Sequence, residues 1–108
     1  MEVEDLSNSY DVVITIVDKG LTEKIVDEID KNGVSGVTIL PGRGRSTKTP
    51  MYLFGLVIEP ERDCIIVLTP SAKTDEVFEI IMTTGNLQNP GQGLVLVLDL
   101  KKVGGIHA

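Results

Sequence analysis

Two periodicities of hydrophobic residues alternate along this chain, and each change between them marks a new element. Runs of consecutive β-branched and aliphatic residues predict buried strands at 11–17 and 64–69. Further strands are predicted for the apolar runs 35–40, 51–58 and 94–100. Gly55 interrupts the run 51–58 and predicts a bulge or a bend there.

Two other segments carry apolar residues at the spacing of an amphipathic helix, with charged residues between them. The first segment ends at Asn32-Gly33, where glycine suits the left-handed cap of a helix. The second segment begins at Pro70-Ser71 and ends at Thr84-Gly85. Their predicted buried faces are Leu21, Ile25, Val26 and Ile29 in the first helix, and Val77, Ile80 and Ile81 in the second.

The main elements follow the order strand, helix, strand, strand, helix, strand, which is a weak internal repeat of two strand–helix–strand halves. This order predicts an α+β fold of the ferredoxin-like βαββαβ type, with an antiparallel sheet and two helices on one of its faces. We expect a flexible tail at 1–10 and a single domain at 11–108.

The predicted strands are apolar at nearly every position rather than at every second one. Both faces of the sheet must therefore be covered, although both helices are expected on one face. The simplest cover for the other face is another copy of the chain, so the pattern predicts a homo-oligomer.

Composition and charge narrow the classes of partner. The chain has 108 residues, 42% of them apolar but only 4% aromatic, so Val, Ile and Leu must form the core. The net charge of −6 argues against nucleic acid and against anionic membrane surfaces as partners. No apolar run approaches the roughly 20 residues that span a bilayer. The acidic start predicts no signal peptide, so a cytoplasmic protein is expected.

Enzyme chemistry and metal binding have little support in the sequence. Cys64 lies in an apolar run and is predicted to be a small buried hydrophobe, whereas His107 is predicted to be a solvated residue near the end of the chain. Most carboxylates lie at the spacing of a solvated helix face, and Ser46 has no visible base. We therefore expect no catalytic residue, no metal ligand and no required cofactor.

A cationic loop, PGRGRSTKTP at 41–50, stands out in this acidic chain because it contains no carboxylate. Its glycines allow a ligand to approach the backbone, and Arg43 and Arg45 can each donate paired hydrogen bonds to phosphate oxygens. The loop TGNLQNPGQG at 84–93 has backbone amides that could surround an anion. We expect both loops near the same sheet edge, where they can meet across a subunit boundary.

Three segments resemble the PII nitrogen-regulatory signal proteins: GVSGVTILPGRGRS at 33–46, CIIVLTPSAKTDEVFEIIMTTGNL at 64–87 and NPGQGLVLVLDLKKVGGI at 89–106. The resemblance implies a homotrimer of ferredoxin-like subunits that binds ATP or ADP between subunits. It further implies that a long mobile loop docks on a regulated transporter, enzyme or transcription regulator, and that 2-oxoglutarate is often sensed.

Carried over residue by residue, the resemblance implies a ligand site and an effector loop. The ligand is expected to be ATP, ADP, AMP or another small anion. The implied anion-binding residues are Gly42, Arg43, Gly44, Arg45, Ser46, Asn89, Gly91, Gln92 and Gly93. The implied effector-loop residues are Thr47, Lys48, Thr49 and Tyr52.

The chain departs from the family pattern at several ligand positions. Gln92 or Gly93 stands where the family usually has a Lys, and Ser46 stands where it usually has a Gln. Gly105 and His107 stand where two Arg are usual. Three alternatives with the same fold remain open: a trimer like the divalent-cation-tolerance proteins, another small-ligand-binding protein, and an enzyme of the acylphosphatase type.

Overall fold

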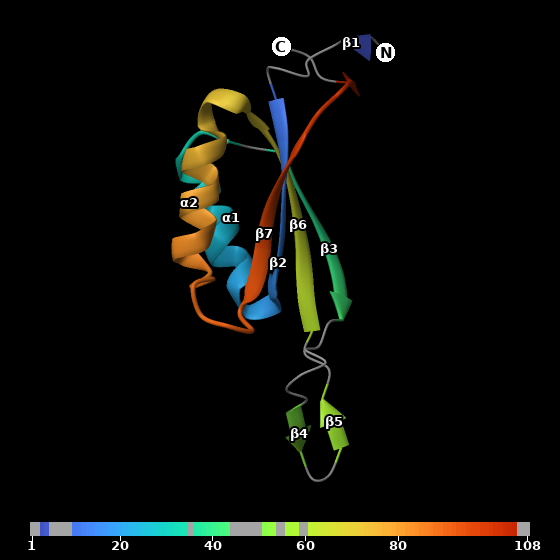
Figure 1. Ribbon diagram of the computed structural model, residues 1–108, viewed down its shortest axis with the longest axis vertical. Helices are drawn as coiled ribbons and strands as arrows, with labels where there is room; N and C mark the ends of the chain where they lie inside the picture. Colours follow the sequence, from blue (N-terminus) through green and yellow to red (C-terminus); the bar gives the residue numbers. More distant parts are fainter. Residues whose placement is uncertain are drawn as a thin grey trace.

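The computed structural model describes residues 3–4, 10–34, 36–43, 51–53, 56–58 and 61–105. Its main sheet has four antiparallel strands in the order β3-β6-β2-β7. These strands are β2 (Tyr10–Asp18), β3 (Val37–Arg43), β6 (Glu61–Pro70) and β7 (Gly93–Asp99). The helices α1 (Thr22–Lys31) and α2 (Thr74–Thr84) both lie on one side of this sheet (Figure 1).

Short elements complete the described part of the chain. Each helix is preceded by one turn of 3-10 helix, η1 (Lys19–Leu21) before α1 and η2 (Ser71–Lys73) before α2. Two small antiparallel pairs lie outside the main sheet. They are β1 (Val3–Glu4) with β8 (Val103–Gly104), and β4 (Met51–Leu53) with β5 (Leu56–Ile58).

This arrangement confirms the predicted ferredoxin-like α+β fold. Helix α1 connects β2 to β3, and both of these strands flank β6; helix α2 connects β6 to β7, and both of these flank β2. The internal repeat is visible in the positions of side chains as well. Thr74 follows Thr22 by the same number of residues as Asp63 follows Asp11. Each threonine is the first residue of its helix and hydrogen-bonds the aspartate of the other half.

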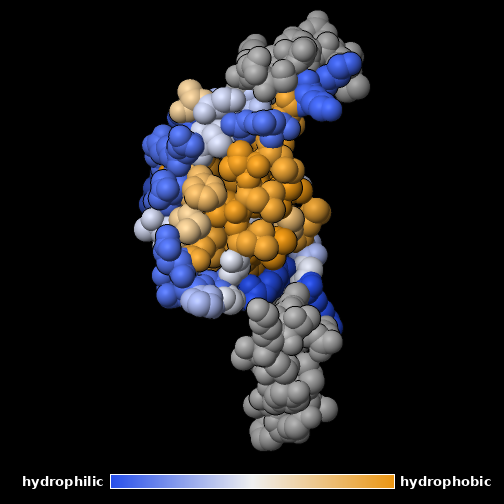
Figure 2. All heavy atoms as spheres, in the orientation of Figure 1, coloured by the Kyte–Doolittle hydropathy of each residue, from blue (hydrophilic) through white to orange (hydrophobic). Residues whose placement is uncertain are grey.

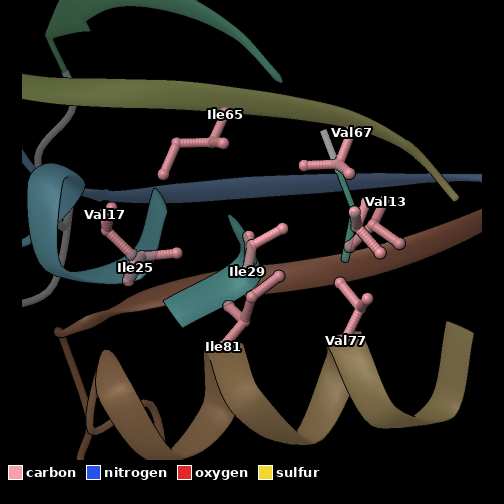
Figure 3. Close-up of a cluster of buried hydrophobic side chains, with 9 residues drawn as sticks. Val13, Val17, Ile25, Ile29, Ile65, Val67, Val77 and Ile81 are labelled. Carbon is pink, nitrogen blue, oxygen red and sulfur yellow. The ribbon is translucent and has the colours of Figure 1, made fainter. Parts of the chain in front are cut away.

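The core lies between the sheet and the two helices. Alternate residues of β2 and β6 point to the helices and are fully buried, as are the residues of α1 and α2 that face them (Figure 3). The labelled core residues are Val13, Val17, Ile25, Ile29, Ile65, Val67, Val77 and Ile81. The predicted helix faces are confirmed, with Leu21, Val26 and Ile80 packed at the margin of the core.

The opposite side of the sheet, called the open face below, is apolar and uncovered by either helix. Strand register places three rows of side chains on it, and Figure 2 shows apolar atoms gathered continuously over the strands. The rows are Leu40–Cys64–Ile16–Leu94, Thr38–Ile66–Ile14–Leu96 and, beyond them, Leu68–Val12–Leu98. Leu40 and Leu98 each keep 50% of their surface exposed. Cys64 is half-buried rather than buried because it lies on this face.

The strand boundaries differ from the prediction in three places. The run 51–58 is two strands paired antiparallel, with Leu53 opposite Leu56, rather than one strand with a bend. Strand β6 begins at Glu61, because pairing with β2 and β3 on either side holds its polar start in the sheet. Strand β3 continues to Arg43, so Gly42 and Arg43 belong to a strand and not to a loop.

The predicted tail also differs from the structure in its details. Tyr10 is the first residue of β2 and pairs with Pro70. Val3 and Glu4 pair with Gly104 and Val103, so part of the first ten residues forms a strand with the end of the chain.

Candidate functional site

One end of the sheet collects the described residues of the predicted anion site. At this end β3 and β2 finish, and β6 and β7 begin. A row of paired residues crosses all four strands there, from Pro41 through Asp63 and Val17 to Gly93. The next residues outward include Gly42, which pairs with Arg62, and Arg62 in turn pairs with Asp18. The two predicted loops therefore meet the sheet at the same end.

The expectation that both loops lie near the same edge needs a correction. Gly42 lies on β3 and Gly93 begins β7, and these strands form opposite edges of the sheet. Two strands, β6 and β2, separate them. With neighbouring strands about 4.8 Å apart, the two positions are about 14 Å apart across the sheet. Strand order, which no local pattern predicts, is the reason for this separation.

A hollow of about 290 Å³ lies beside the end of β3. Three cationic residues, Lys19, Arg43 and Arg62, line it together with Pro41 and Gly42. Two carboxylates, Glu61 and Asp63, also line it. The hollow thus joins the described half of the GRGR motif to cations from two other elements.

The charges around the hollow differ in how firmly they are held. Lys19 Nζ lies 3.5 Å from Glu61 Oε2, and both side chains are about two thirds exposed, at 66% and 64%. Such an exposed pair is weak and exchanges readily with solvent ions. Asp63, in contrast, is buried and accepts a hydrogen bond of 2.6 Å from Thr22 Oγ1. The exposed charges of this hollow are therefore Lys19, Glu61 and Arg43.

The glycine loop before β7 is held by bonds of its own. The Asn89 amide donates to the Asn86 carbonyl at 3.2 Å, and the Gln92 amide donates to the Asn89 carbonyl at 3.4 Å. Two of the amides expected to be free for an anion are thus engaged within the loop. Arg62 donates to the carbonyl oxygens of Gly91 at 3.2 Å and Gln92 at 3.3 Å.

Gly93 needs to be glycine for a steric reason. Its φ of +146° lies in a region that other residues rarely adopt, and a Cβ there would lie 2.2 Å from the Ile16 carbonyl oxygen. Its place in the site is therefore set by close contact with β2.

Several predicted residues lie outside the described part of the chain: Gly44, Arg45, Ser46, Thr47, Lys48, Thr49 and His107. Tyr52 lies in β4, in agreement with the strand predicted for its segment. Gly105 follows β8 with a φ of +89°.

Sequence reasoning missed Lys19 and Arg62. Lys19 lies two residues after the predicted strand 11–17, and Arg62 lies between the predicted strands 51–58 and 64–69. Arg62 pairs with Gly42 only because β3 continues to Arg43 and β6 begins at Glu61. The predicted strands 35–40 and 64–69 include neither residue, so the sequence carried no signal for this pairing.

The described residues contain neither a metal-binding cluster nor a membrane-spanning helix. Within 3–4, 10–34, 36–43, 51–53, 56–58 and 61–105, no three His, Cys, Asp or Glu residues lie together so as to hold a metal ion. In that same part of the chain, neither α1 nor α2 has the length and apolar character needed to cross a membrane.

The fold and the glycine-bounded sheet end define a small α+β protein of the ferredoxin-like class. A family model described as nitrogen regulatory protein P-II matches residues 10–108. The chain therefore belongs to the nitrogen regulatory protein P-II family, as its sequence resemblance indicated. A direct comparison with curated protein sequences finds no match.

Among solved structures, the chain is similar to Arabidopsis thaliana PII bound to citrate. The TM-score is 0.68 at 17% sequence identity, covering 86% of this chain and 78% of that chain. At this identity the likeness establishes the shared fold.

Proposed function

We propose that this protein is a regulatory member of the P-II family rather than an enzyme. It binds a small anionic effector, with an adenine nucleotide as first candidate, and it controls a partner protein in nitrogen regulation. The observation that carries the proposal is the hollow at the end of β3, where Gly42 and Arg43 meet Lys19 and Arg62. Lys19 and Arg43 are exposed cations, and beside the Gly42 backbone, which lacks side-chain bulk, they suit phosphate or carboxylate groups.

The proposed anion site extends to Gly44, Arg45 and Ser46 on one side and to Asn89, Gly91, Gln92 and Gly93 on the other. Gly42 and Gly93 lie on opposite edges of one sheet, about 14 Å apart across the strands. A ligand bound at only one of the two loops of a subunit leaves space beside it for groups from a second subunit. This separation favours a site at the boundary between subunits.

A homotrimer is the assembly we propose, and the open face supports an assembly of copies. Exposed large apolar residues on β3 and β7 would lie in water in a single chain. Contiguous apolar surface of this kind marks an interaction site in soluble proteins. A second copy of the chain carries the same apolar surface and can cover it.

Control of the partner is proposed to act through the segment between β3 and β6. Thr47, Lys48, Thr49 and Tyr52 belong to this segment, and both of its ends adjoin the hollow, at Arg43 and Glu61. An effector bound there would contact the base of the segment. We also propose a cytoplasmic location, which cell fractionation tests.

Isothermal titration calorimetry tests the ligand. ATP, ADP, AMP and citrate are titrated separately into the folded protein; citrate is included because the structurally similar Arabidopsis protein is bound to it. At least one nucleotide should bind. The double variant Arg43→Ala with Arg45→Ala should bind it at least about tenfold more weakly. Lys31→Ala, which removes an exposed cation from α1, is the matched control and should bind like the wild type.

Two results of this titration would lead to different conclusions. A folded oligomer that binds no member of the panel contradicts the anion proposal. Unfolding of the double variant would instead show that the two arginines stabilise the fold.

A further inference from the structure

Arg62 is the residue that touches both described halves of the proposed site. Its backbone pairs with Gly42 of β3, and its guanidinium donates to the carbonyl oxygens of Gly91 and Gln92 before β7. It is also the second residue of β6, directly after the segment that we propose contacts the partner. Arg62 therefore contacts both sides of the site, β3 through its backbone and the loop before β7 through its side chain.

The reach of Arg62 has a structural cause. Strand β7 pairs with β2 from Asp99 only as far as Gly93, opposite Val17. Beyond that point Gln92 and Gly91 have no strand partner, and the guanidinium supplies donors to their carbonyl oxygens instead. The planar guanidinium presents several N–H groups in a fixed geometry, which suits two neighbouring carbonyls.

The surroundings of Arg62 hold it in this place. Its side chain is only 17% exposed, and Nη1 lies 3.6 Å from Asp18 Oδ1 at the end of β2. Removing the carbonyl contacts would leave a largely desolvated cation with Asp18 alone as its described partner. The contacts to the loop are therefore favoured over a free, solvated side chain.

We propose that Arg62 is a positioning residue that fixes the glycine loop 89–93 relative to β6 and to the end of β3. It thereby sets where this loop, one half of the proposed anion site, lies relative to the end of β3 in the same subunit, an inference that rests on the proposed function. A shift in position at the start of β6, where the chain re-enters the sheet after residue 60, would therefore move the loop 89–93 through the hydrogen bonds of the Arg62 side chain.

The test compares Arg62→Met with the wild type by hydrogen exchange followed by mass spectrometry. Methionine keeps the length and the apolar stem but donates no hydrogen bond. Peptides covering 86–93 should exchange about tenfold faster, while peptides of α2 exchange at the wild-type rate. Arg62→Lys keeps the charge but not the paired donors, and it should give a smaller increase. Lys31→Met removes a cation far from the site and should leave exchange at 86–93 unchanged.

ATP titration of the same variants supplies the second readout. The affinity should fall about tenfold in Arg62→Met and less in Arg62→Lys, with thermal unfolding of both variants still cooperative. Unchanged exchange at 86–93 in a folded variant overturns the proposal, and so does faster exchange combined with wild-type affinity for ATP. If the wild type binds no ATP, the nucleotide proposal fails, whereas the exchange result still decides whether Arg62 holds the loop.

Discussion

The hydroxyl of Thr22 donates a 2.6 Å hydrogen bond to the Oδ2 atom of Asp63, and both residues are buried. Thr22 begins α1, and Asp63 lies in β6 beside the hollow. The other half of the repeat contains the same bond, from Thr74 to Asp11, also at 2.6 Å. Each half of the fold thus anchors the helix of the other half.

Thr22→Val should lower the free energy of unfolding by about 1–3 kcal/mol, because it leaves a buried carboxylate without its donor. Urea unfolding followed by circular dichroism measures this. Thr22→Ser keeps the hydroxyl and should lose less than about 1 kcal/mol, through the missing methyl group alone. Equal losses in the two variants would mean that the hydrogen bond contributes nothing.

Thr15→Val should raise the free energy of unfolding by about 1 kcal/mol. Thr15 is fully buried in β2, and its Oγ1 atom has no hydrogen-bond partner among the described residues. Valine has the same shape and removes a polar group that is costly to bury. Thermal unfolding checks the prediction. Thr22→Val is the comparison, because it makes the same substitution at a threonine whose hydroxyl is hydrogen-bonded. A lower melting temperature for Thr15→Val would show that the hydroxyl is satisfied.

Gly93→Ala should destabilise the protein by about 3 kcal/mol or more. The added Cβ would meet the Ile16 carbonyl oxygen, and the backbone at Gly93 has a φ of +146°. Gly42→Ala is the control, because a Cβ at Gly42 meets no atom within 4 Å and its φ is not positive. Its stability should stay within about 0.5 kcal/mol of the wild type. Equal losses in the free energy of unfolding for the two variants would contradict the special steric requirement at Gly93.

Gly42→Ala also tests ligand binding without disturbing the fold. If an anion approaches the β3 backbone, the added methyl group should weaken binding of ATP about tenfold while the melting temperature stays unchanged. Titration calorimetry on the folded variant measures this. Wild-type affinity would place the ligand away from Gly42.

Leu96→Glu should convert the proposed homotrimer into monomers. Leu96 lies on the open face and is 38% exposed in the single chain, so a charge there is tolerated in a monomer. Burying that charge between copies would cost several kcal/mol. Light scattering after size-exclusion chromatography measures the mass. Glu79→Lys, an exposed change on α2, should leave the mass unchanged. A wild-type chain that is monomeric throughout would contradict the oligomer itself.

Most of the fold followed from local patterns. The β-branched run 11–17 and the helical spacing of Ile25 and Ile29 each reflect a period that neighbouring residues share, so both elements were predicted in nearly the right place. The continuous apolar pattern also predicted a second covered face, and the exposed Leu94 and Leu98 lie there. The segment 51–58 was predicted less well, because a reversal between Leu53 and Leu56 interrupts an apolar run without changing its composition.

The candidate site was less predictable than the fold. Glycine and arginine in GRGR pointed to the end of β3, and the family resemblance pointed to the loop before β7. Neither indicated Arg62, whose role depends on pairing with Gly42 and on contact with a loop about 30 residues later.

The sequence by itself determined the order of strands and helices, the apolar character of both sheet faces and the family, because these depend on the type and spacing of residues along the chain. Only the tertiary structure decided that β3 and β7 form opposite edges, that Asp63 is buried against Thr22, and that Arg62 contacts both the end of β3 and the loop before β7. Those relationships depend on strand order and register, which arise when residues distant in the chain pair with one another.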